Sequence, residues 1–201
     1  KRAERTGVNG LLVVTPYYNK GNENGIYEHY KAIAEAVKIP IILYNVPSRT
    51  GVNLSISLLK KLAQIENITA LKEASGNISY VAEVAREVPK LDIYSGNDDM
   101  VVPVLSLGGK GVISVSANII PDINHEMVVS FLNGDIEKAR ELQLKYNDLV
   151  NALFLETNPV PIKEAMNFLG YQVGNCRLPL GMMEESNRAK LKDILIAHEV
   201  T

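Results

Sequence analysis

The chain has 201 residues, of which 46% are hydrophobic and 22% are charged, and its formal net charge is −2. These values are ordinary for a soluble globular protein, and they lack the basic excess that nucleic-acid binding requires. No apolar stretch approaches the roughly 20 residues of a membrane span. The single cysteine, Cys176, excludes an intrachain disulfide and fits a reducing compartment. We therefore expect a cytoplasmic protein with neither nucleic acid nor a membrane as partner.

Short apolar runs alternate with helix-period segments in the first part of the chain. We predict strands over residues 10–15, 39–45, 68–73, 91–95 and 111–116, helices near 24–37, 54–66, 77–88 and 99–107, and helix N-caps at Ser55, Asn77 and Asn97. Residues 1–7 fit the tail of a further helix. The strands are almost continuously apolar, which is typical of parallel strands covered on both faces. The pattern indicates βα units and a parallel sheet.

Helical periodicity dominates from Pro121 onward. Asp135 is placed to cap a long amphipathic helix that runs to about Glu156, and a proline-rich break at 158–161 precedes helices near 162–169 and 184–199. No low-complexity linker separates the two parts. We expect an α/β region over residues 1–118 and a continuous helical region over 119–201.

Polar residues follow each predicted strand at its C-terminal end. In a βα barrel this end is the catalytic face, and in an open doubly wound sheet it is the ligand edge. Both architectures fit the pattern, and both bring several strand ends to one site.

Lys72 closes the third predicted strand. Low-dielectric walls would disfavour its ammonium form, lower its pKa and make a free amine available for Schiff-base chemistry. Taken alone, a strand-end lysine more often extends its ammonium group to solvent.

A Schiff-base enzyme also needs a proton relay and a cation for a substrate carboxylate. Tyr44 carries a hydroxyl and Arg49 a guanidinium at the end of the neighbouring strand. Singly, each fits an ordinary core tyrosine or a solvated loop arginine, but the three residues on adjacent strand ends favour a catalytic site. The three histidines, His29, His125 and His198, are too scattered for a metal cluster.

Two segments, Tyr44–Gly51 and Leu71–Asn77, resemble the signatures of the dihydrodipicolinate synthase family, within the N-acetylneuraminate lyase superfamily. Further segments match in order: Thr15–Asn19, Tyr94–Asp98, Gly108–Val115 and Glu156–Pro161. The resemblance spans essentially the whole chain. It implies a class I, pyruvate-dependent aldolase or lyase that condenses pyruvate with aspartate semialdehyde in the diaminopimelate pathway of lysine biosynthesis.

The resemblance also implies roles by position. Lys72 would form the Schiff base with pyruvate and Tyr44 would relay protons. Arg49 would hold the carboxylate of aspartate semialdehyde, while Gly96 and the Ile113 carbonyl would line the pyruvate pocket. Tyr18 matches a relay tyrosine that crosses a dimer interface, and Tyr17 matches a position linked to lysine feedback. No metal or organic cofactor is implied, because the Schiff base on Lys72 is covalent.

The implied fold is a (β/α)₈ TIM barrel followed by helices, but only five strands are predicted here. About three N-terminal βα units are expected to be missing. The family motif Gly-Thr-Thr-Gly-Glu has no counterpart in this sequence. We therefore expect a truncated, partial barrel over residues 1–118.

A partial barrel would leave two strand edges unpaired. It can be a fragment of a longer polypeptide, it can associate with another copy, or its N-terminal part can refold. We favour a homo-oligomer that covers these edges. The alternative to an active enzyme is a catalytically impaired relative that keeps the scaffold and self-assembles.

Overall fold

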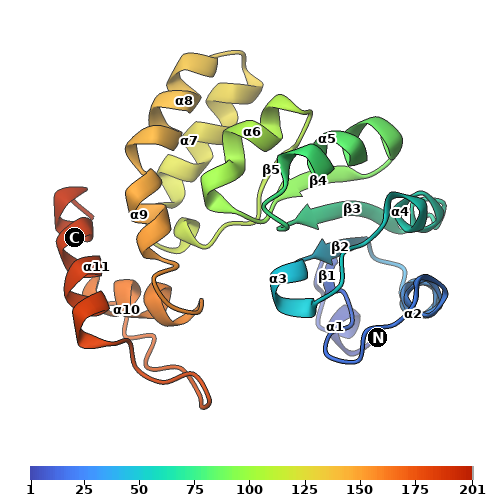
Figure 1. The fold of residues 1–201 in the computed structure, drawn as a ribbon, viewed down its shortest axis with the longest axis horizontal. Helices are drawn as coiled ribbons and strands as arrows, with labels where there is room; N and C mark the ends of the chain where they lie inside the picture. Colours follow the sequence, from blue (N-terminus) through green and yellow to red (C-terminus); the bar gives the residue numbers. More distant parts are fainter. Residues whose placement is uncertain (201) are drawn as a thin grey trace. The chain divides into compact units, whose positions relative to one another are not determined.

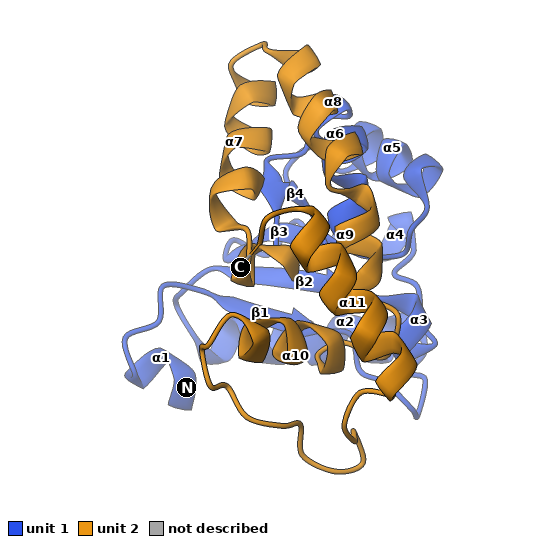
Figure 2. Ribbon diagram, turned by 90° about the vertical axis from the view of Figure 1, so that its left-hand side faces the viewer, with its two compact units in different colours: residues 1–113 blue, residues 114–201 orange. Residues whose placement is uncertain are grey.

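A computed structural model describes residues 1–200 of the chain. The chain divides into two compact units, Lys1–Ile113 and Ser114–Thr201, which Figure 2 shows in different colours. The boundary expected from the sequence, after residue 118, stays a prediction.

The first unit is built on a parallel sheet of five strands. They are β1 (Leu11–Val14), β2 (Ile41–Asn45), β3 (Ile68–Glu73), β4 (Asp92–Ser95) and β5 (Gly111–Val112). Their order in the sheet, β1-β2-β3-β4-β5, is the order in the chain, and every neighbouring pair is parallel. The predicted parallel sheet of βα units is therefore confirmed.

The helices of this unit decide between the two architectures that the sequence left open. They are α1 (Arg2–Arg5), α2 (Glu23–Ala36), α3 (Pro47–Thr50), α4 (Ile56–Leu62), α5 (Ile78–Glu87) and α6 (Val101–Ser106). In Figure 1, α2, α4, α5 and α6 follow one face of the sheet, and each packs against the next. A doubly wound sheet would carry helices on both faces. Sequential strand order with helices on one face is instead the winding of a βα barrel.

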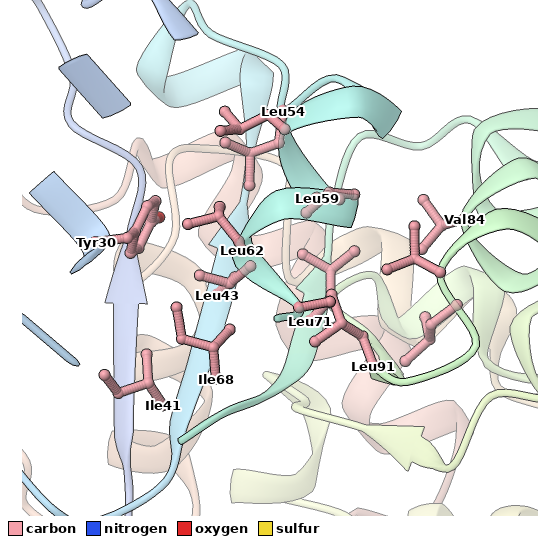
Figure 3. Close-up of a cluster of buried hydrophobic side chains, with 14 of the residues drawn as sticks. Tyr30, Ile41, Leu43, Leu54, Leu59, Leu62, Ile68, Leu71, Val84 and Leu91 are labelled. Atoms are coloured by element: carbon pink, nitrogen blue, oxygen red, sulfur yellow. The ribbon is translucent and has the colours of Figure 1, made fainter. Parts of the chain in front are cut away.

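An apolar core joins this helical layer to the sheet (Figure 3). The fully buried side chains include Tyr30, Ile41, Leu43, Leu58, Leu59, Leu62, Leu71 and Val84. Because Leu43 and Leu71 fill this core, the residues that follow them in β2 and β3 point to the opposite face of the sheet.

Two of the three predicted helix caps are confirmed. The side chain of Ser55 accepts a hydrogen bond from the amide of Leu58, and that of Asn77 accepts one from Tyr80. Asn97 does stand at the N-cap position of a helical turn, but its side chain forms no capping hydrogen bond, and its Nδ2 atom lies 3.7 Å from the sulfur of Met100. A short 3₁₀ turn, Asp98–Met100, precedes α6 and alters the geometry of this helix entry.

The fifth strand is shorter than the predicted range 111–116. Pairing ends near Ile113, and residues Ser116–Asn118 form a 3₁₀ turn. The Ser114 hydroxyl accepts a hydrogen bond from the amide of Ala117 at 2.8 Å. This serine offers the backbone a partner other than the sheet, which favours a turn over a longer strand.

The second unit is helical, as predicted. It contains α7 (Pro121–Leu132), α8 (Ile136–Lys145), α9 (Asn147–Ala152), α10 (Val160–Phe168) and α11 (Glu185–Ala197). Asp135 caps α8 by accepting a hydrogen bond from Lys138. The predicted single helix from Asp135 to Glu156 is wrong, because the backbone leaves helical geometry at Tyr146 and α9 then packs against α11. Within residues 1–200, no helix is long and apolar enough to cross a membrane.

Candidate active site

The parallel register brings the predicted reactive side chains to one edge of the sheet. Tyr44 on β2 pairs with Lys72 on β3, and Lys72 pairs with Tyr94 on β4. Side chains in register point to the same face of a parallel sheet. Tyr44 and Lys72 therefore meet at the C-terminal strand ends, on the face that the helices of the first unit leave open.

Lys72 lies directly over the ring of Tyr44, with its Nζ atom 4.4 Å from the ring centroid. Burial lowers the pKa of the half-buried Lys72 amine, the negative charge of Asp98 opposes that shift, and the positive charge of Arg49 adds to it. The site therefore makes the neutral amine, the form that attacks a carbonyl carbon, more accessible than it is on an exposed lysine.

Tyr44 is held as a protonated hydroxyl at neutral pH. Burial raises its pKa, and the charge of Arg49 opposes the shift. Its backbone is fixed by Thr15, whose amide and hydroxyl both donate to the Tyr44 carbonyl oxygen at 3.1 and 3.0 Å. The hydroxyl of Tyr30 reaches Thr15 Oγ1 at 3.4 Å. The end of β1 thus fixes the tyrosine that faces the lysine.

Arg49 comes from α3, a short helix that the sequence analysis missed. Pro47 stands at its first turn, and Gly51 ends it with a φ of +70°. The Thr50 hydroxyl donates to the carbonyl oxygen of Val46 at 3.2 Å, which closes the turn. Proline at the start and glycine just past the end is the signal that could have found this helix. The helix places a cation where its charge acts on both Lys72 and Tyr44.

Gly96 lies close to the lysine side chain. Its amide donates to the Glu73 carbonyl oxygen at 2.7 Å, and a Cβ atom here would lie 3.1 Å from Lys72 Cε and 2.7 Å from Ala74 Cβ. Any larger residue would have to displace one of these neighbours. Glycine at the end of β4 therefore leaves the space that Lys72 occupies.

The structure does not bring all predicted residues to this cluster. Ile113 extends the pairing of β5, because its amide donates to the Ser95 carbonyl oxygen at 2.9 Å. Tyr17 and Tyr18 lie in the loop between β1 and α2 with exposed fractions of 66% and 88%, and Tyr18 has a φ of +67°. Neither tyrosine reaches Lys72 within the part of the chain that the structure describes.

Two buried acidic residues were missed as parts of the site. Asp98 is 2% exposed and raises the pKa of Lys72, and Glu73 is 3% exposed in the position after the lysine. Both stand next to the ends of apolar strands, which is a signal for a buried and therefore partnered carboxylate. Among residues 1–200, no three potential ligands gather in a way that could hold a metal ion.

Comparison with known proteins places the chain in a family. The family model "Dihydrodipicolinate synthetase family" matches residues 1–198. The chain belongs to this family. It is 58% identical over 201 residues to the 4-hydroxy-tetrahydrodipicolinate synthase of Caldicellulosiruptor bescii, and 56% identical over 195 residues to that of Brachyspira hyodysenteriae. These alignments cover 100% and 97% of the chain, but 68% and 67% of the relatives.

Solved structures agree with the fold. The synthase of Cyanidioschyzon merolae with lysine bound matches with a TM-score of 0.96 at 41% identity, covering 100% of this chain and 68% of that one. The chloride-inhibited synthase of Acinetobacter baumannii complexed with pyruvate matches with a TM-score of 0.95 at 40% identity, covering 99% and 69%. The expected partial barrel is thus confirmed, and the chain spans about two thirds of the length of its relatives.

The charges around Lys72 predict how its reactivity depends on pH. Amine labelling of Lys72 should have a midpoint below the ordinary lysine value of about 10.4. Replacing Arg49 with alanine removes a cation and should raise the midpoint, whereas Asp98→Asn removes an anion and should lower it. Peptide mass spectrometry after labelling across a pH series measures each shift, with exposed Lys190 in the same digest as reference. Shifts in the opposite directions would contradict the assigned electrostatics.

Proposed function

We propose that the chain is a class I lyase of the dihydrodipicolinate synthase type, which condenses pyruvate with aspartate semialdehyde in lysine biosynthesis. The observation that carries this proposal is the half-buried Lys72 amine over the ring of Tyr44 at the ends of β3 and β2. Family membership and the pyruvate complex of the A. baumannii relative support the choice of first substrate.

The proposed chemistry begins with attack of the neutral Lys72 amine on the keto carbon of pyruvate. The carbonyl oxygen leaves as water after taking up two protons, one of them from the amine, and the nitrogen keeps its other proton and forms a positively charged double bond to the carbon. Loss of a methyl proton gives an enamine whose carbon attacks the aldehyde of the second substrate. Tyr44 is proposed to move protons in these steps, because its hydroxyl stays protonated beside the amine.

Arg49 is proposed to bind the carboxylate of aspartate semialdehyde, since a planar guanidinium matches that group with two parallel hydrogen bonds. Gly96 and the Ile113 carbonyl are proposed to line the pyruvate pocket. Tyr18 would relay protons or cross a dimer interface, and Tyr17 would contribute to a lysine site, which the lysine-bound C. merolae structure supports. The covalent Schiff base on Lys72 would replace any metal or organic cofactor. We propose a cytoplasmic location, which the single cysteine fits.

A second candidate is a relative that keeps the scaffold and self-assembles but is catalytically impaired or inactive. Two observations favour it: the chain spans about two thirds of its relatives, and its sequence contains no Gly-Thr-Thr-Gly-Glu motif. Turnover with aspartate semialdehyde separates the two candidates, because the first requires normal turnover and the second excludes it.

Borohydride reduction in the presence of pyruvate should trap an adduct on Lys72. The expected mass increase equals pyruvate less water plus two hydrogens, located by peptide mass spectrometry. Lys72→Ala should abolish the adduct, while Lys60→Ala, at an exposed lysine of α4, should not. A folded chain that gives no adduct would refute the Schiff-base mechanism.

Replacement of Tyr44 with phenylalanine should lower turnover with both substrates by roughly 100-fold or more, because a positioned proton relay contributes that much. Tyr27→Phe, in α2 on the helical side of the sheet, is the matched control and should retain activity. Turnover is measured by coupled reduction of the condensation product. An adduct on the unaltered chain without any turnover would establish the second candidate instead.

We also propose that the chain forms a homo-oligomer. Within residues 1–200, β1 and β5 each pair with one strand only, and Leu12 on β1 is 45% exposed. Unpaired strand edges bind other strands readily. At micromolar concentration the chain should sediment heavier than its 22.1 kDa mass, and Leu12→Lys should shift it toward the monomer. Leu144→Lys, at a 69% exposed residue of α8, is the control. A monomeric unaltered chain would contradict the proposal.

A further inference from the structure

The carboxylate next to the reactive lysine is buried on the other face of the sheet. Glu73 follows Lys72 in β3, and alternation along a strand turns their side chains to opposite faces. Glu73 Oε1 accepts hydrogen bonds from the amide of Ser75 at 2.9 Å and from Asn45 Nδ2 at 3.0 Å. Burying a carboxylate costs free energy of folding unless hydrogen bonds compensate it, so these two bonds stabilise Glu73 in its buried position.

Asn45 extends this contact to a second segment. It is fully buried at the end of β2 and pairs in register with Glu73. Its amide group also donates to Asn53 Oδ1 at 2.8 Å, and its Oδ1 accepts a hydrogen bond from the amide of Leu54 at 3.1 Å. One side chain therefore joins the carboxylate on β3 to residues eight and nine positions further along the chain.

These residues close the loop that carries Arg49. The loop leaves β2 at Asn45, passes through α3, and returns at Leu54 to the side chain of the residue where it began. Within it, the amides of Arg49 and Thr50 donate to the Val46 carbonyl oxygen at 2.9 and 3.1 Å. Loop entry and loop exit are both tied to Asn45, and Asn45 is tied to Glu73.

The far side of the loop is anchored to the helical layer. The hydroxyl of Tyr80 on α5 donates to the Leu54 carbonyl oxygen at 2.6 Å. Burial raises the pKa of Tyr80, and the charge of Glu73 adds to the shift, which places the two groups within electrostatic reach. Burial also raises the pKa of Glu73, against the bonds from Ser75 and Asn45. The carboxylate is thus the anchor point of a closed, buried set of hydrogen bonds.

We propose that Glu73 is a positioning residue that, through Asn45, holds the Arg49 loop at a fixed place relative to Lys72. Strand β3, which carries Lys72, would then also fix the position of Arg49, the cation proposed to bind the carboxylate of the second substrate. This inference rests on the proposed function. It assigns Glu73 no contact with either substrate.

Kinetics of Glu73→Ala test the role in catalysis. We expect kcat/KM for aspartate semialdehyde to fall roughly 100-fold, as for a reactive group moved by about 1 Å. The pyruvate adduct on Lys72 should still form, and Glu73→Gln, which keeps an acceptor oxygen, should restore most of the activity. Glu87→Gln, at a partly exposed carboxylate that pairs with Lys60 at the end of α5, makes the same change of charge as Glu73→Gln and should have no effect.

A double-mutant cycle separates positioning from a general loss of stability. If Glu73 acts through the loop, Glu73→Ala should cause no further loss of kcat/KM in an Arg49→Ala background. Losses that multiply would show that Glu73 acts independently of Arg49 and would overturn the proposal. If Glu73→Ala does not fold, Asn53→Ala breaks the same set of bonds at its far end and should give a smaller loss that also vanishes in the Arg49→Ala background.

Hydrogen exchange provides a readout that needs no turnover. In Glu73→Ala, the amides of Thr50 and Leu54 should exchange faster, while that of Leu71 in β3 keeps its protection. Unchanged exchange at Thr50 and Leu54 would overturn the proposal even in an inactive chain. Absence of a pyruvate adduct on the unaltered chain would instead refute the proposed function, so the two failures are distinguishable.

Discussion

The register between β2 and β3 is the constraint on which the site depends. Tyr44 pairs with Lys72, and the next pair along the strands is Asn45 with Glu73. Because side chains alternate between faces, the first pair faces the open side of the sheet and the second is buried on the helical side. A slip of one residue would bury the amine and expose its anchor. The apolar core around Leu71 opposes that slip, since it would put the side chain of Lys72 at the core position that Leu71 fills.

Desolvation and charge act against each other at Lys72. Burial and the cation of Arg49 favour the neutral amine, while Asp98 favours the ammonium form. A nucleophile works best when its pKa lies near the working pH, so a partial shift suits a reaction in which the same nitrogen must also be protonated. Asp98 is 2% exposed, and Gly96, two residues before it, lies so close to the lysine that an added Cβ would stand 3.1 Å from Lys72 Cε. The pKa of the Lys72 amine thus depends on close packing around the ends of β3 and β4.

The sequence predicted the five strands, the main helices and the cluster of Lys72, Tyr44 and Arg49, because apolar runs and polar strand ends are local signals. It failed where tertiary contacts override local pattern, as at Tyr146, where a buried ring interrupts a helical period. The bonds from Glu73 to Asn45 and from Asn45 to Leu54 were also invisible. They join residues from separate segments, and no spacing rule in one sequence encodes such pairs.

The residues proposed for the two parts of the reaction lie at different places in the sheet, one on a central strand and one beyond an edge strand. Lys72 lies on β3, which has strands on both sides, so its surroundings are fixed by register and by the helical core. Tyr18 follows β1, which within residues 1–200 pairs on one side only, and its side chain is 88% exposed. The amine therefore has its environment within the first unit, whereas the relay proposed for Tyr18 requires further groups at an open edge. Schiff-base formation depends only on the environment of the amine. Complete turnover depends on that environment and on the relay proposed for Tyr18, so a chain can form the adduct without completing the reaction.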